Sequence, residues 1–97
     1  MATEVTLLLG SNAEDAAAIV ERAIAIIANS VGEVVRTSRE YRSEAYGFTA
    51  EREFVNRAVV VMVECDAYEV LRRINLIEAL LGRDREEEMR IKSAKGE

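Results

Sequence analysis

Histidine, proline and tryptophan are absent from this sequence of 97 residues, and cysteine occurs once, as Cys65. A single thiol cannot form a disulfide within the chain, and it is too few for a cysteine metal cage. A reducing cytoplasm therefore fits this composition, and we predict a cytoplasmic protein. Because Cys65 follows a β-prone segment, we expect its side chain to fill apolar space.

Long apolar runs are also missing. No stretch approaches the roughly 18 consecutive apolar residues that a membrane-spanning helix needs, and the N-terminus has no signal-peptide pattern. The sequence therefore predicts a protein that is neither exported nor inserted in a membrane.

The sequence also lacks an excess of positive charge. The formal net charge is −5, and an acidic domain binds nucleic acid poorly. The most β-prone segment also lacks the aromatic series that stacks bases.

The composition is 49% hydrophobic and 32% charged, which is typical of a globular protein. It predicts one domain over residues 1–97, with residues 83–97 as a charged loop or tail.

Hydrophobic periodicity predicts two helices and several strands. In order along the chain, we expect a strand at residues 5–9, a helix at 13–30, a strand at 33–43, a loop at 44–53, a strand at 54–64, a helix from 66 that ends at Gly82, and a weak strand at 89–93.

This order, β-α-β-β-α(-β), is that of a split βαβ unit, in which two helices cover one face of an antiparallel sheet. The first and third strands should be central. Residues 58–63 are apolar without a break, so we expect both faces of that strand to be covered. Residues 5–9 need a last strand as neighbour. Residues 89–93, a partner chain in a homodimer, or a continuation of the natural protein beyond Glu97 would each supply it.

The helices carry end signals and apolar stripes. Glu14 and Asp15 are expected in the first turn of the first helix, where acids favour the helix dipole. Asp66, with Glu69 three residues later, is expected to cap the second helix. The predicted buried stripes consist of Ile19, Val20, Ala23, Ile24 and Ile27 in the first helix and of Val70, Leu71, Ile74, Ile77 and Leu81 in the second.

Phe54 and Asn56 are the first candidate site residues. They are two apart on a predicted strand and therefore share a face. An aromatic ring beside an amide could bind a flat heterocycle with polar edges. They could equally be a core phenylalanine and an asparagine at a turn.

Two loops offer weaker signals. Gly10-Ser11-Asn12 follows the first strand, where it either caps the next helix or brings backbone N–H groups toward a phosphate. Tyr46 and Phe48 lie in the 44–53 loop, where aromatic side chains either close over a ligand or pack the loop down.

The end of the second helix holds a polar group. Asn75 and Glu78 are three apart, hence on one side of the helix, and Arg83 and Arg85 follow it. An amide, a carboxylate and two guanidiniums could hold a nucleotide, with the arginines on its phosphates. A solvated helix end with cations near the C-terminal dipole explains the same residues.

Four segments together resemble one family, the 6-hydroxymethyl-7,8-dihydropterin pyrophosphokinases, over about residues 5–85. They are Leu8-Leu9-Gly10-Ser11-Asn12, Ser38-x-x-Tyr41-Arg42-Ser43-Glu44-x-x-Gly47, Phe54-Val55-Asn56-x-Ala58-Val59 and Ile77-Glu78-x-x-Leu81-Gly82-Arg83-x-Arg85. The resemblance implies a ferredoxin-like α+β fold. It also implies transfer of pyrophosphate from ATP to the pterin hydroxymethyl group, in folate biosynthesis.

The resemblance also implies roles for individual residues. Phe54 would stack on the pterin, and Asn56 would hydrogen-bond its polar edge. The rim of the pterin pocket would be Ser43, Glu44 and Tyr46. The ATP contacts would be Asn75, Glu78, Arg83 and Arg85, of which the two arginines would also serve catalysis by contacting phosphates.

The sequence departs from the family pattern in one respect. Family members carry an Asp-x-Asp segment whose aspartates bind Mg²⁺, and no Asp-x-Asp occurs in these 97 residues. A second aromatic residue that sandwiches the pterin is also missing. Mg²⁺ is thus implied as cofactor, but we predict no metal ligand in this chain. We expect either an incomplete or diverged pyrophosphokinase, or a non-catalytic ferredoxin-like module for ligand binding or dimerisation.

Overall fold

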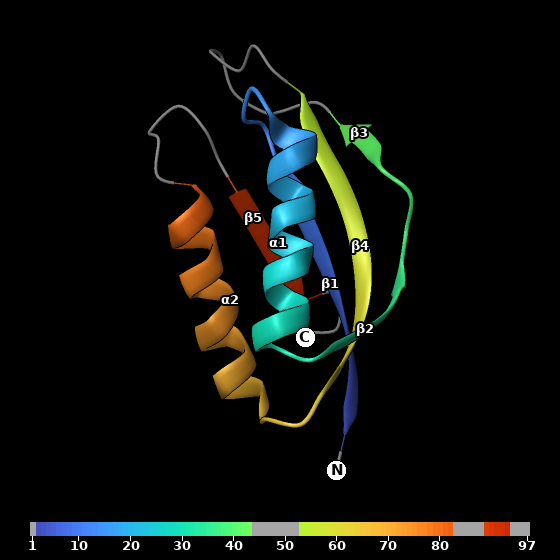
Figure 1. Cartoon of the computed structure of the whole chain (residues 1–97), viewed down its shortest axis with the longest axis vertical. Helices are drawn as coiled ribbons and strands as arrows, with labels where there is room; N and C mark the ends of the chain where they lie inside the picture. Colours follow the sequence, from blue (N-terminus) through green and yellow to red (C-terminus); the bar gives the residue numbers. More distant parts are fainter. Residues whose placement is uncertain (1, 44–52, 83–88, 94–97) are drawn as a thin grey trace.

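The fold follows the predicted order of elements. A computed structural model describes residues 2–43, 53–82 and 89–93. The elements are β1 (Thr3–Ser11), α1 (Ala16–Ser30), β2 (Glu33–Thr37), β3 (Tyr41–Ser43), β4 (Phe54–Val63), α2 (Ala67–Leu81) and β5 (Met89–Ser93). Both helices lie side by side on one face of the sheet (Figure 1). This confirms an α+β ferredoxin-like fold. Among the described residues, neither helix is long and apolar enough to span a bilayer.

The sheet is antiparallel, with the strand order β2-β4-β1-β5 and with β3 paired to β4. β1 pairs with β4 along its whole length, from Thr3 opposite Val63 to Ser11 opposite Val55. The first and third predicted strands are therefore central, as expected. β5 pairs with residues 7–11 of β1. The weak strand predicted at 89–93 thus supplies the last strand of the sheet.

The strand predicted at 33–43 is interrupted, which corrects the expectation of one continuous strand. Its pairing with β4 shifts register between Val34 and Arg36, and it breaks at Ser38. The Ser38 N–H donates to the Ala58 carbonyl at 2.7 Å, while the Ser38 Oγ accepts from the Ala58 N–H at 2.9 Å. The serine side chain thus replaces one backbone bond of the ladder, and the chain turns away before β3.

The expectation that both faces of residues 58–63 are covered is wrong. Val59, Val61 and Val63 lie under the helices and are at most 2% exposed. Val60 and Met62 point to the other face and are only half-buried. The reason is that both helices pack on the same side (Figure 1), so the continuous valine run reflects β-propensity as well as burial.

The core lies between this helix layer and the sheet. α1 buries Ala16, Val20, Ala23 and Ile27, and α2 buries Val70, Ile74 and Ile77. Leu71, predicted to be buried, is 51% exposed. It follows Val70 by about 100° around the helix and so lies on the flank of the stripe.

The sequence predicted the start of α2 correctly but not the start of α1. α1 begins at Ala16, so Glu14 and Asp15 precede its first turn, and the prediction that places them inside it is wrong. The Ser11 Oγ accepts from the Ala13 N–H at 3.1 Å and holds the residues before the helix in a turn.

In α2, the Asp66 side chain accepts from the Glu69 N–H, as predicted. Hydrogen bonds from Arg72 and Arg73 lower the pKa of Glu69 to about 2.

Candidate functional site

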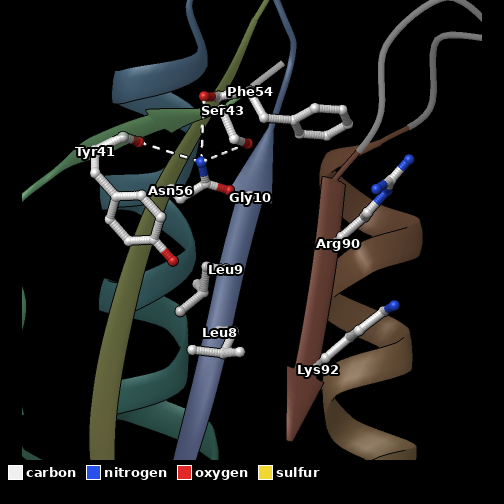
Figure 2. Close-up of a pocket in the computed structure, with 9 residues that line it drawn as sticks. All are labelled: Leu8, Leu9, Gly10, Tyr41, Ser43, Phe54, Asn56, Arg90 and Lys92. Atoms are coloured by element: carbon white, nitrogen blue, oxygen red, sulfur yellow. Dashed lines mark hydrogen bonds between the residues drawn. The ribbon is translucent and has the colours of Figure 1, made fainter. Parts of the chain in front are cut away.

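One row of residues crosses four strands on the helix-free face of the sheet. Tyr41 of β3 pairs with Asn56 of β4, Asn56 pairs with Gly10 of β1, and Gly10 pairs with Arg90 of β5. Directly paired residues lie on the same face of a sheet. These four residues, which are far apart in the sequence, therefore share one surface (Figure 2).

A pocket of about 490 Å³ lies over this row. Its size is within the range of about 300–1,000 Å³ that is usual for small-molecule sites. Residues from four strands line it, and they are Leu8, Leu9, Gly10, Tyr41, Ser43, Phe54, Asn56, Arg90 and Lys92. One side is apolar and amide-bearing, and the side formed by β5 carries two positive charges.

The Asn56 amide is held in one orientation. Its Nδ2 lies 3.2 Å from the Tyr41 carbonyl oxygen, 3.0 Å from the Ser43 Oγ and 3.3 Å from the Phe54 carbonyl oxygen. Because carbonyl oxygens only accept, the atom that faces them is the amide nitrogen. The Asn56 Oδ1 is left to point across β1 toward Gly10 (Figure 2). The pocket thus offers a hydrogen-bond acceptor to a ligand N–H group.

Gly10 has no side chain and therefore leaves room for the Asn56 Oδ1. A Cβ at residue 10 would lie 2.8 Å from the Asn56 Oδ1 and 3.5 Å from the Phe54 Cδ1. Glycine in a strand interior packs nothing, and it often marks a place where another group must approach the backbone closely. Here the approaching groups are the Asn56 amide and the Phe54 ring.

The Phe54 ring is almost fully covered by the protein. Only 3% of the residue is exposed, and the Arg90 Cζ lies 4.4 Å from the ring centroid. This is cation–π geometry. Phe54 was predicted to be either a ligand-contacting residue or a core residue. It is buried as a core residue would be, and it also lines the pocket. The Arg90 guanidinium thus lies over the Phe54 ring.

The structure brings part of the predicted site together. Ser43, Phe54 and Asn56 line the same pocket. Asn75 and Glu78 lie on α2, on the opposite face of the sheet, and Asn75 is exposed. The remaining predicted site residues, Glu44, Tyr46, Arg83 and Arg85, lie outside the described residues.

Glu78 has a defined partner. Its Oε2 accepts from the Ile91 N–H of β5 at 2.6 Å. β5 lies at the edge of the sheet, so this N–H is a donor that the sheet ladder leaves for another acceptor. A carboxylate from α2 therefore fastens the edge strand that carries Arg90 and Lys92.

Replacing Glu78 with alanine should lower the free energy of unfolding by about 1.5–3 kcal/mol, because a half-buried donor loses a charged acceptor. Urea denaturation would measure the change. Asn75→Ala, one turn away and exposed, is the matched control and should stay within about 0.5 kcal/mol. Equal stability of the two variants would show that Glu78 does not hold β5.

Tyr41, Arg90 and Lys92 were not predicted as ligand-contacting residues, and Gly10 was named only as part of a turn that either caps the next helix or brings backbone N–H groups toward a phosphate. The alternation of Met89 and Ile91 with Arg90 and Lys92 could have shown that both cations share one face of the last strand. Which residues they face depends on the pairing of β5 with β1, and a single sequence does not give that register.

The described residues of the pocket do not fit Mg²⁺. A magnesium site in a protein is built from carboxylates and other oxygen ligands, whereas the charged side chains of this lining are Arg90 and Lys92. Across residues 2–43, 53–82 and 89–93, no group of three or more Asp, Glu, His or Cys residues is placed to hold a metal ion. The described residues therefore provide no ligand set for Mg²⁺.

Fold and pocket together define a class, a ferredoxin-like α+β domain with a ligand pocket on the sheet face opposite its helices. The chain belongs to the family of 7,8-dihydro-6-hydroxymethylpterin-pyrophosphokinase (HPPK), whose model matches residues 6–93.

Individual relatives support the same family. The chain is 39% identical over 85 residues to the 2-amino-4-hydroxy-6-hydroxymethyldihydropteridine pyrophosphokinase of Methylorubrum extorquens. It is 33% identical over 79 residues to the protein of that name from Porphyromonas gingivalis. The alignments include 87% and 81% of this chain. They cover 54% of the length of each relative, so the chain matches about half of these proteins.

Proposed function

We propose that this chain takes part in the transfer of pyrophosphate from ATP to 6-hydroxymethyl-7,8-dihydropterin in folate biosynthesis, and that the pocket on β1, β3, β4 and β5 is its pterin site. The observation that carries the proposal is the convergence of Ser43, Phe54 and Asn56 on one pocket. These three residues belong to the segments that resemble the family, and two strands bring them together.

The pocket residues would bind and orient the pterin. The Asn56 Oδ1 would accept from an N–H group on the ring edge, with the amide held by Tyr41, Ser43 and Phe54. The Phe54 ring would contact the flat face of the pterin. A rigid acceptor beside an aromatic surface fixes both the position and the rotation of a flat ligand. Positioning is the larger part of what a protein contributes to phosphoryl transfer.

The ATP side of the proposal depends on Asn75, Glu78, Arg83 and Arg85, with the two arginines on the phosphates. The Glu78 carboxylate accepts from the Ile91 N–H of β5, and α2 lies across the sheet from the pterin pocket, so the ATP side rests on the resemblance of these residues to the family. Family membership also implies Mg²⁺, for which the described residues offer no fitting ligand set.

The pocket residues come from one chain. A homodimer through the outer edge of β5 would have to displace the Glu78 carboxylate.

Release of AMP from ATP and Mg²⁺, with and without 6-hydroxymethyl-7,8-dihydropterin, tests this function. We expect pterin-dependent AMP. Asn56→Ala should reduce it, whereas Tyr68→Leu, an exposed residue on α2, should leave it unchanged. Absence of both AMP and pterin binding would refute the proposed function.

A second candidate is a pterin-binding module without catalysis. The observation that favours it is the charge of the pocket, where β5 contributes Arg90 and Lys92 and the described lining contains no carboxylate. Saturable pterin binding without AMP release in the same assay would favour this candidate over the enzyme.

A further inference from the structure

Arg57 follows Asn56 on β4, but its side chain points to the other face of the sheet. Successive residues of a strand alternate between the two faces, so Arg57 shares the helix side with the buried Val59 and Val61. Its side chain is only 19% exposed. A guanidinium is always charged and has several N–H donors, so one that is largely buried needs acceptors around it.

The Arg57 guanidinium joins α1 to the end of β2. Its Nε donates to the Ser38 carbonyl at 3.0 Å, and its Nη2 donates to the Thr37 Oγ1 at 3.1 Å. Its Nη1 donates to the carboxylate of Glu21, on α1. A planar guanidinium holds several acceptors in one fixed geometry. Residues 37–38 are therefore fastened both to β4 and to the helix layer.

This corner at residues 37–38 leads into β3. The chain passes through residues 39–40 and then forms β3, whose three residues are all exposed and which pairs with β4. A strand this short has few contacts of its own, so the corner that precedes it helps to set its position. β3 supplies the Tyr41 carbonyl and the Ser43 Oγ, two of the oxygens that accept from the Asn56 Nδ2 (Figure 2).

We infer that Arg57 is a positioning residue of the pocket, which acts through the corner at 37–38 and β3 on the Asn56 amide, and that Glu21 orients Arg57. With its nitrogen side held by β3, the Asn56 amide offers its Oδ1 to a ligand. An amide released by β3 can rotate and offer a donor in place of that acceptor. The ligand part of this inference rests on the proposed pterin site, whereas the orientation of Asn56 is a property of the chain alone.

Arg57→Lys tests this inference, because lysine keeps the charge but lacks the planar fork that reaches all three acceptors. The side-chain amide protons of Asn56 should exchange with water at least roughly fivefold faster, the effect of losing about one hydrogen bond. Affinity for 6-hydroxymethyl-7,8-dihydropterin should fall by about the same factor. Heteronuclear NMR of the whole chain would measure exchange. The backbone N–H of Val61, at the centre of the sheet, reports general destabilisation and should keep its rate.

Two further variants complete the experiment. Thr37→Val removes only one acceptor of Arg57 from an exposed position and should raise the exchange rate of the Asn56 amide by a smaller factor. The matched control is Arg36→Lys, the same substitution in an exposed arginine of β2 that pairs with Glu4. It should leave both the exchange rate of the Asn56 amide and the pterin affinity unchanged.

The outcomes separate this inference from the proposed function. Unchanged exchange at Asn56 in Arg57→Lys, or faster exchange at Asn56 and Val61 alike, would overturn the positioning role, since an arginine that only stabilises the fold predicts one of these results. Faster exchange at Asn56 with unchanged pterin affinity would overturn the ligand part. Absence of pterin binding by the wild type would refute the proposed function, and the exchange rates would still decide whether Arg57 positions Asn56.

Discussion

Replacing Phe54 with leucine should weaken binding of 6-hydroxymethyl-7,8-dihydropterin by about 1–3 kcal/mol, as judged from the loss of aromatic stacking on heterocyclic bases. Phe54 lines the pocket next to Asn56, and leucine keeps apolar volume while it removes the flat ring. Fluorescence titration of the pterin would measure the change.

Alanine at the same position should act mainly on stability. Phe54 is 3% exposed, and truncation of a buried phenylalanine costs about 3–5 kcal/mol. That is a large part of the roughly 5–15 kcal/mol that stabilises a small domain, so Phe54→Leu is the variant that isolates binding. Tyr68→Leu, in which an aromatic residue 84% exposed on α2 is replaced, should change neither quantity. Wild-type pterin affinity in Phe54→Leu would make Phe54 a core residue only.

Gly32→Ala should lower the free energy of unfolding by about 3 kcal/mol, at the upper end of the usual cost of overpacking. A Cβ at residue 32 would overlap the backbone carbonyl of Met62, and a carbonyl of a central strand cannot move without disturbing the sheet. Urea denaturation would measure the loss.

Gly10→Ala is the informative comparison for Gly32→Ala. Its added Cβ would meet the Asn56 Oδ1 at 2.8 Å, which is a side-chain atom that can rotate away. We expect a smaller loss of stability than in Gly32→Ala but a larger loss of pterin affinity, because Asn56 can yield only by giving up its hydrogen bonds to β3. An equal effect of both variants on stability, with pterin affinity unchanged, would contradict the role assigned to Gly10.

Substitutions in the pocket are expected to change both the free energy of unfolding and the pterin affinity, because the pocket residues also hold the sheet together. The same sheet face that lacks a helix cover carries the pocket, and its residues hold one another in place through β3 and β5. Asn56 is fixed by Tyr41 and Ser43, and β5 is fixed by Glu78. Hydrogen bonds from the edge of the sheet therefore hold residues that line the pocket near its centre.

Much of this protein was determined by the sequence alone. The valine-rich segment at 54–63, the stripe of Val20, Ala23 and Ile27, and the Asp66 cap each predict their element from local physics, because strand propensity, helical periodicity and capping act over a few residues. Their order was enough for the ferredoxin-like fold. The four short segments around Gly10, Tyr41, Asn56 and Glu78 were enough for the family.

The tertiary structure alone decided the chemistry of the pocket. Periodicity gives which residues of one strand share a face, but it does not give which residues of the neighbouring strands lie beside them. The row of Tyr41, Asn56, Gly10 and Arg90 exists only through three pairings between distant segments. The same pairings turned the Asn56 oxygen toward the pocket and set Arg90 on Phe54. The packing of both helices on one side left this face open, since a continuous apolar strand is compatible with one covered face or two.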